Sequence, residues 1–281
     1  MGSLELAVGD LVFDARAEGP DDGELVLLLH GFPQTSYSWR HQLPAIAAAG
    51  FRAVAPDQRG YSPRARPADV TSYRAERYVE DVLGLADALG ADRFHLVGHD
   101  FGGFVAWDVA SLHPERLSTL TVVSTPHPTP MAKSILEGGE QRDRSSYMLF
   151  FRSPEAEAFF LDNEAAGLRS LYEASGLTDF DEYVRVLTQP GAMTGALNWY
   201  RGVDRSVAAE MKPVTTPTLY VWSTNDPALG REAAEATAGY VRGPYQFEVL
   251  DGVGHWIPEE APDALNALLL EHLGGESTRR P

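Results

Sequence analysis

Cysteine is absent from the 281 residues of this chain. Without thiols the protein forms no disulfide, has no cysteine nucleophile and offers no thiolate to a metal ion. Several histidines also stand apart from any metal-ligand spacing: His41, His95, His113, His127 and His272. We therefore expect neither a metal nor another cofactor.

Positive charge and long apolar runs are also scarce. Lys and Arg number 23 against 40 Asp and Glu, which gives a formal net charge of −17. Nucleic acids and anionic membranes repel so negative a protein, so we expect neither as a partner. No apolar run approaches the length of about 20 residues that spans a bilayer, and residues 1–5 do not resemble a signal peptide. We expect a cytoplasmic protein, either a monomer or a homodimer.

Short apolar runs recur along the chain, with amphipathic helical patterns between most of them. We predict strands at residues 4–8, 11–15, 26–29, 53–55, 94–97, 120–123, 219–222 and 247–250. The first two flank Gly9-Asp10 and predict a hairpin. Helical patterns cover residues 78–89 and 101–112. Strands alternating with helices indicate an α/β fold whose mostly parallel central sheet is flanked by helices on both faces.

Residues 127–213 interrupt this alternation, because no strand pattern occurs there. The region is rich in aromatic residues at helical spacing, and strand patterning resumes directly after it. We therefore predict a helical lid at 127–213, inserted into a core formed by residues 1–126 and 214–281. A separate helical domain is the alternative.

The segment 97–103, Val-Gly-His-Asp-Phe-Gly-Gly, has the pattern of a nucleophile elbow. Such an elbow is a sharp strand-to-helix turn that exposes one side chain at the C-terminal edge of a sheet. Here that side chain is Asp100, where most such turns carry serine. A carboxylate that displaces a leaving group from saturated carbon becomes an ester, which activated water can cleave. Asp100 therefore indicates alkyl transfer, by opening an epoxide or displacing a halide, unless it only caps the following helix.

Two partners for this nucleophile follow in the expected order of nucleophile, acid and histidine. Asp226 comes just after the predicted strand at 219–222, and His255 lies in a glycine-rich loop after the strand at 247–250. We predict that His255 takes a proton from the water that attacks the ester, and that Asp226 orients the imidazole. Each residue alone could be structural, but the three together favour catalysis.

Residues 30–33, His-Gly-Phe-Pro, directly follow the predicted strand at 26–29. An oxyanion hole in this architecture combines a backbone N–H from such a loop with the N–H of the residue after the nucleophile. We assign these donors to Phe32 and Phe101. The bond between Phe32 and Pro33 is a candidate cis peptide, although an ordinary turn is the alternative.

Together these motifs resemble the α/β-hydrolase fold and, within it, the epoxide hydrolases. The resemblance covers nearly the whole chain: residues 30–33 and 38–40, 57–62, 98–103, Asp226, and 254–256. It implies an epoxide hydrolase that forms vicinal diols from a small epoxide and water. Phe32, Pro33 and Trp256 are then expected to line the substrate pocket.

The lid distinguishes epoxides from halides. Epoxide hydrolases similar to this chain polarise the epoxide oxygen with two lid tyrosines, and their motifs resemble the surroundings of Tyr200 and Tyr147. Tyr172 and Tyr183 are competing candidates. Haloalkane dehalogenases of similar fold use a tryptophan after the nucleophile, whereas here Phe101 has no ring N–H to bind halide.

A neutral, apolar or aryl epoxide is therefore the expected substrate. A haloalkane or haloacid dehalogenase using the same nucleophile stays open as the alternative enzyme. Haloacid enzymes carry arginines just after the nucleophile, and residues 101–104 contain none. A ligand-binding receptor that kept the fold and lost turnover is the alternative outside catalysis, although the intact nucleophile, acid and histidine argue against it.

Overall fold

The computed structural model describes residues 2–138, 140–203 and 211–277. Within these residues an eight-stranded sheet has the order β1-β2-β4-β3-β5-β6-β7-β8. β1 pairs antiparallel with β2 and β2 with β4, whereas the other neighbouring strands run parallel. The strands are β1 (Gly2–Val8), β2 (Leu11–Glu18), β3 (Leu25–Leu29), β4 (Arg52–Pro56), β5 (Phe94–His99), β6 (Leu117–Val123), β7 (Thr218–Ser223) and β8 (Tyr245–Leu250).

The strands and helices predicted for the core are confirmed. Each observed strand contains its predicted range and extends one to three residues beyond it. The helix predicted at 101–112 is α3 (Phe101–Leu112), and the one predicted at 78–89 is α2 (Ala75–Ala88). The strands could be predicted from the sequence because the sheet is buried on both faces, so each strand is a continuous apolar run.

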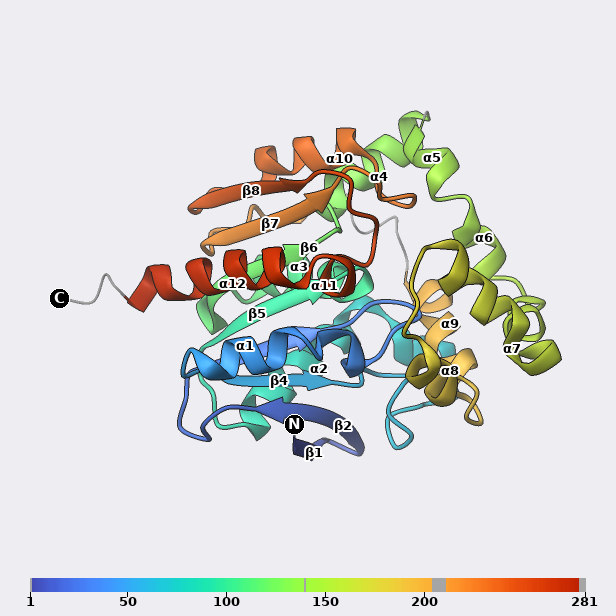
Figure 1. Cartoon of the computed structure of the whole chain (residues 1–281), viewed down its shortest axis with the longest axis horizontal. Helices are drawn as coiled ribbons and strands as arrows, with labels where there is room; N and C mark the ends of the chain where they lie inside the picture. The colour runs from blue at the N-terminus through green and yellow to red at the C-terminus, as the bar shows by residue number, and fades with distance from the viewer. Residues whose placement is uncertain (1, 139, 204–210, 278–281) are drawn as a thin grey trace.

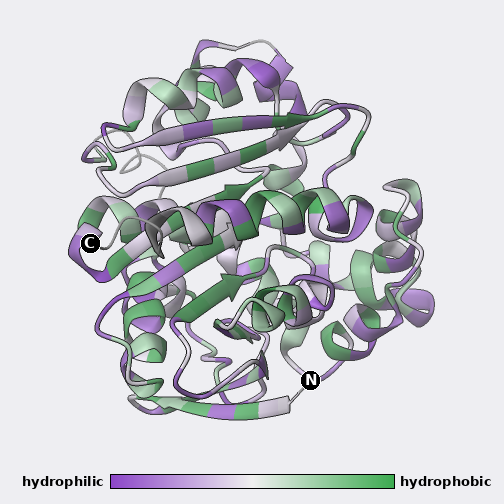
Figure 2. Ribbon diagram, turned by 60° about the vertical axis from the view of Figure 1, so that its left-hand side comes forward, coloured by the Kyte–Doolittle hydropathy of each residue, from purple (hydrophilic) through white to green (hydrophobic). Residues whose placement is uncertain are grey.

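Buried side chains alternate along the central strands between two hydrophobic clusters. In β3, Leu27 and Leu29 belong to one cluster, whereas Val26 and Leu28 belong to the other. Residues of α2 and α3 complete the first cluster, and residues of α1 (Gln42–Ala48) and α12 (Pro262–Ser277) complete the second. Figure 1 shows α1 and α12 in front of the sheet and α3 behind it, and Figure 2 shows hydrophobic residues concentrated along the middle strands. Helices therefore cover both faces, as predicted.

The remaining core elements are short. They are the helices α10 (Arg231–Ala236) and α11 (Ile257–Glu260) and 3-10 helices at Ser36–Trp39, Val70–Tyr73, Pro114–Arg116 and Thr237–Tyr240. Among the residues described, no helix is both long enough and apolar enough to cross a membrane.

Within the described residues, six α-helices lie in the chain between β6 and β7, and we call them the inserted helices. They are α4 (Pro128–Glu137), α5 (Glu140–Arg144), α6 (Tyr147–Phe151), α7 (Ala156–Ala174), α8 (Asp181–Leu187) and α9 (Ala192–Gly202). Residues 139 and 204–210 of the predicted lid lie outside the described residues. Figure 1 shows α6, α7, α8 and α9 gathered together at one side of the sheet.

Hydrogen bonds join the inserted helices to loops of the core. The indole N–H of Trp199 in α9 donates to the carbonyl of Arg59 at 2.6 Å. The hydroxyl of Tyr172 in α7 donates to the carbonyl of Pro33, in the loop after β3. Because these donors are buried and reach backbone carbonyls, they fix where α7 and α9 sit above the ends of the strands.

Candidate active site

Asp100 lies between β5 and α3 in an uncommon backbone conformation, with φ 51° and ψ −119°. A non-glycine residue in such a conformation costs about 1 to 3 kcal/mol and persists only where its surroundings enforce it. The turn is tight enough that a side chain at Gly98 would overlap the backbone of Gly102. These features are those of the nucleophile elbow that the motif at 97–103 predicts.

The two oxygens of the Asp100 carboxylate have different neighbours. The backbone N–H of Phe32 donates to Oδ1 at 2.9 Å, and Nε2 of His255 lies 3.4 Å from Oδ2. Gly31 permits this approach, because a Cβ atom there would collide with the carboxylate. Burial alone would raise the pKa of Asp100, but His255 and the Phe32 N–H outweigh burial and hold that pKa below its usual range. The carboxylate is therefore ionised.

His255 joins Asp100 to Asp226. Its Nδ1–H donates to Oδ2 of Asp226 at 2.7 Å, while Oδ1 of Asp226 accepts the backbone N–H groups of Ala228 and Leu229 at 2.8 and 3.0 Å. Asp226 is only 2% exposed. The structure thus brings together the three residues that the sequence placed after three separate strands, because parallel strands end at the same edge of the sheet.

The imidazole of His255 carries a proton in this arrangement. Burial alone would lower the pKa of His255, but the carboxylates of Asp226 and Asp100 outweigh burial and raise it to about 10. Asp226 and the predicted nucleophile, Asp100, therefore together stabilise the positive charge of His255. Loss of the charge on Asp100 would lower the pKa of His255.

His99 and Ser124 were not identified as functional from the sequence, yet both hold the His255 loop. Nε2–H of His99 donates to the carbonyl of His255 at 2.9 Å, and Oγ of Ser124 donates to the same carbonyl at 3.1 Å. Burial and the neighbouring charge of His255 lower the pKa of His99 to about 4, so its ring is neutral. No sequence signal links these residues to His255, because the contact depends on the loop conformation.

Phe32 and Phe101 are the two residues predicted to form the oxyanion hole. The bond between Phe32 and Pro33 is cis, as predicted. The N–H of Phe32 points at Asp100, whereas the N–H of Phe101 makes no hydrogen bond to that carboxylate within the described residues. The oxyanion role assigned to Phe101 therefore stays a prediction.

Tyr200, in α9, packs above the elbow. Its ring centroid lies 5.2 Å from that of Phe32 and 5.9 Å from that of Phe101. Tyr147, in α6, reaches these rings only through Phe151. Its ring centroid lies 5.0 Å from that of Phe151, whose ring contacts those of Phe32 and Tyr200. Both tyrosines thus belong to the aromatic cluster above Asp100.

The two competing tyrosines are engaged elsewhere. The hydroxyl of Tyr172 donates to the carbonyl of Pro33, and that of Tyr183 donates to Oε1 of Glu259 at 2.8 Å. Burial raises the pKa of both phenols well above the usual value. These contacts favour a positioning role for both residues.

Trp256 directly follows His255, and its ring centroid lies 4.8 Å from that of the imidazole. Its indole N–H donates to Oγ of Ser175 at 2.6 Å, so the ring is tied to the end of α7. This position beside His255 agrees with the pocket role of Trp256, which stays a prediction.

Glu259 is a further residue that the sequence did not reveal. Its carboxylate accepts from Arg40 at 2.6 Å, from Tyr183 at 2.8 Å and from Gln34. Burial raises the pKa of Glu259 to about 7, although Arg40 opposes the rise. One side chain therefore connects the loop after β3, the inserted helices and the segment that follows His255.

Metal-ligating side chains do not gather near Asp100. Within the described residues there is no group of three or more His, Cys, Asp or Glu side chains with the geometry of a metal site. The contacts above serve a carboxylate and an imidazole, and the chemistry that they can support is nucleophilic attack followed by proton transfer.

The fold and this geometry define a class of protein. The family described as the alpha/beta hydrolase fold matches residues 24–262. The chain therefore belongs to the α/β-hydrolase family and is a hydrolase.

Similar proteins narrow the class further. Epoxide hydrolase 4 of Mus musculus is 36% identical over 282 residues, which cover 96% of this chain and 78% of the relative. Epoxide hydrolase A of Mycobacterium tuberculosis is 33% identical over 302 residues, which cover 93% and 94%. A solved structure described as one of several novel epoxide hydrolases in metagenomes from hot environments has a TM-score of 0.88 and 31% identity, covering 98% and 99%. Within its family, the chain belongs with the epoxide hydrolases.

Proposed function

We propose that this protein hydrolyses a neutral epoxide to a vicinal diol through an ester on Asp100. In the first step Oδ2 of Asp100 attacks a ring carbon of the epoxide, and the bond between that carbon and the ring oxygen breaks. Oδ1 is held by the N–H of Phe32 at 2.9 Å, which leaves Oδ2 as the attacking atom. The product is a hydroxyalkyl ester of the enzyme.

The released ring oxygen needs a proton. Tyr200 and Tyr147 are the proposed donors, because Tyr200 packs on the rings of Phe32 and Phe101 and Tyr147 belongs to the same aromatic cluster. A phenol donates a hydrogen bond to the ring oxygen in the ground state and its proton to the forming alkoxide. The cluster also provides an apolar surface for an alkyl or aryl substituent.

Esterification changes the charge beside His255. The ester is neutral, so the pKa of His255 falls from about 10 and the imidazole releases its proton to solvent. Neutral His255 then takes a proton from water, and the hydroxide attacks the ester carbonyl carbon. Asp226 stabilises the imidazolium that forms. The bond between Cγ and the alkylated oxygen breaks, that oxygen takes a proton from the imidazolium, and the diol leaves with the original Oδ2. The proton of the re-formed Asp100 carboxyl then returns to His255, and the phenolate regains its proton from solvent.

The oxyanion of this second step develops on Oδ1. We assign its stabilisation to the N–H groups of Phe32 and Phe101. The bond from Phe32 is already formed to the resting carboxylate. A donor that is in place before the reaction costs little reorganisation when the negative charge appears, so the loop after β3 is a direct contributor to the rate.

One observation carries the proposal: an ionised Asp100 lies between a backbone donor and a His255 whose other nitrogen is bound to Asp226. We also propose that residues 127–213 act as a lid over a core of residues 1–126 and 214–281. Phe32, Pro33 and Trp256 form part of the pocket wall in this proposal. A cytoplasmic location and the choice between monomer and homodimer stay predictions.

The experiment is to trap the ester. His255→Gln retains a polar side chain but lacks the base, so incubation with styrene oxide should add the mass of one epoxide to the protein. Peptide mapping by mass spectrometry should place that mass on Asp100. His113→Gln is the matched control, since His113 lies at the far end of α3 and should turn over with no adduct. No adduct on His255→Gln, or halide release from haloalkanes without diol from any epoxide, would contradict the proposal.

A further inference from the structure

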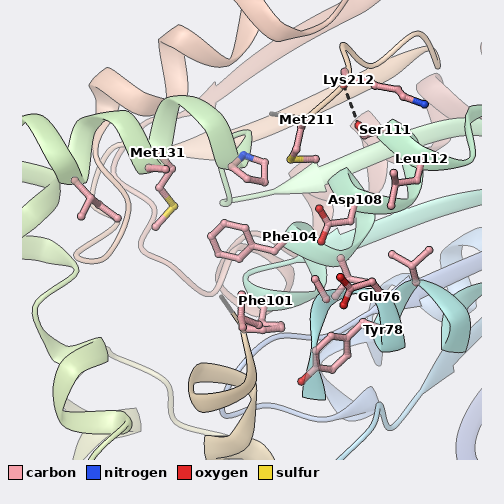
Figure 3. Close-up of a pocket in the computed structure, with 17 residues that line it drawn as sticks. Glu76, Tyr78, Phe101, Phe104, Asp108, Ser111, Leu112, Met131, Met211 and Lys212 are labelled. Carbon is pink, nitrogen blue, oxygen red and sulfur yellow. Dashed lines mark hydrogen bonds between the residues drawn. The ribbon is translucent and has the colours of Figure 1, made fainter. Parts of the chain in front are cut away.

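A cavity of about 390 Å³ lies among α2, α3 and α4, and we call it the α3 cavity (Figure 3). Its size lies within the range of small-molecule sites in proteins. Most of its wall is apolar and includes Val79, Phe104, Met131, Ile135 and Met211. The ring of Phe101 forms another part of the wall, so the α3 cavity reaches the residue next to Asp100 without including Asp100 itself.

Asp108 is the unusual residue of this wall. It lies on the same face of α3 as Phe101 and Phe104, seven and four residues earlier, where an apolar residue would pack better. Its side chain is partly buried, and Figure 3 shows its carboxylate directed into the cavity. In the described part of the chain no hydrogen bond or ion pair reaches this carboxylate.

Two other charged residues line the α3 cavity. Glu76, from α2, is an exposed residue, and its negative charge adds to that of Asp108. Lys212 could neutralise the pair, but Figure 3 shows its ammonium group directed away from both carboxylates. Among the described residues, the cavity therefore combines an apolar wall with a negative charge with which no basic side chain pairs.

This combination selects one kind of ligand. An anion would meet two carboxylates and a net charge of −17, and a neutral molecule would leave the carboxylate of Asp108 covered and unpaired. A cation would pair with it in surroundings of low polarity, where such a pair is stronger than at the surface. We propose that the α3 cavity binds a small apolar molecule with a protonated amine, whose ammonium group contacts Asp108 and whose apolar part lies against Phe104 and Met131.

The test is calorimetric titration of the full chain near pH 8 with phenylbutylamine, phenylbutanol and phenylbutyrate. These probes share one apolar part and differ in charge. We expect the amine to bind about tenfold more tightly than the alcohol, and the acid to bind more weakly than either. The measurement does not involve turnover, so a negative binding result would not bear on the proposed epoxide hydrolysis.

Asp108→Asn should remove the preference for the amine and leave the affinity for the alcohol nearly unchanged. Glu80→Gln is the matched control, because Glu80 is a carboxylate on the neighbouring helix α2 that is exposed, paired with Arg77 and absent from the cavity wall. Burial and Glu76 raise the pKa of Asp108 to about 7, so the wild-type affinity for the amine should fall about tenfold between pH 8 and pH 6. This dependence should vanish in Asp108→Asn.

A second variant tests the location of the site independently of charge. Ala132→Phe, in α4, fills the α3 cavity and should abolish binding of both amine and alcohol. Circular dichroism establishes that each variant is folded. Equal affinity for amine and alcohol, an Asp108→Asn variant that keeps the preference, or no amine binding at millimolar concentration would each overturn the proposal.

Discussion

Replacing Asp100 by Asn removes the negative charge that lies 3.4 Å from Nε2 of His255 while keeping the shape of the side chain. The same charge disappears when Asp100 becomes an ester. The variant therefore has the same charges around His255 as the proposed ester intermediate. The pKa of His255 in the variant measures how far ester formation lowers that pKa.

The size of the effect follows from the geometry. Two unit charges about 4 Å apart interact by about 4 kcal/mol in a typical protein environment. Each kcal/mol changes a pKa by about 0.7, so the pKa of His255 should fall by about 2 to 3 in Asp100→Asn. From a starting value of about 10 this brings the pKa of His255 to about 7 to 8, so a substantial fraction of the imidazole is neutral at physiological pH. Asp226, 2.7 Å away, keeps the pKa from falling further.

The assay is a titration of the histidine ring resonances by NMR. The eight histidines are distinguished by comparing spectra with those of His255→Gln. Asp108→Asn is the control, because it removes a carboxylate from α3 that does not contact His255, and it should leave the pKa of His255 unchanged. An unchanged pKa in Asp100→Asn would refute the reasoning that ester formation converts His255 from an acid to a base.

Three further predictions concern single residues. Tyr200→Phe keeps the ring packing but removes the phenolic donor, so kcat/KM for epoxides should fall roughly 10- to 100-fold with little change in thermal stability; unchanged kcat/KM would contradict its role. Gly31→Ala places a Cβ against Asp100 and should lower kcat at least roughly 100-fold, and wild-type rates would refute the close approach. Asp108→Asn should raise the free energy of unfolding, because burial raises the pKa of Asp108 in the folded protein to about 7, above its usual value of 3.8, and stability is lost as pH rises between these values. Measured by urea unfolding, the free energy of unfolding of Asp108→Asn should exceed that of wild type by roughly 2 kcal/mol near pH 8, a figure reduced because the side chain is partly exposed to solvent, and by almost nothing near pH 4. An equal difference at both pH values would contradict this prediction.

The catalytic constellation could be predicted from sequence because each residue directly follows a buried apolar run. Asp100, Asp226 and His255 lie after β5, β7 and β8, and the common direction of those strands brings the residues to one edge. The motif at 30–33 was identified in the same way, since it follows β3. Local pattern and sheet topology together were enough to place these side chains.

Contacts between the inserted helices and the core could not be predicted in this way. Tyr172 bonds to a carbonyl 139 residues away, and Tyr183 bonds to Glu259, 76 residues away. A tyrosine at helical spacing gives the same pattern whether it packs, bonds or donates a proton. Asp108 could be recognised as an acid in an apolar stripe, but the cavity that it lines depends on the packing of three helices.

The most direct test of the central claim follows oxygen through a single turnover. Excess wild-type enzyme is mixed with styrene oxide in water labelled with oxygen-18, and both the diol and the peptide that contains Asp100 are weighed by mass spectrometry. We expect label in Asp100 and an unlabelled diol, because water attacks the ester carbonyl and the diol leaves with the original Oδ2. Label in the diol with none in Asp100 would contradict it, since water would then have opened the epoxide directly.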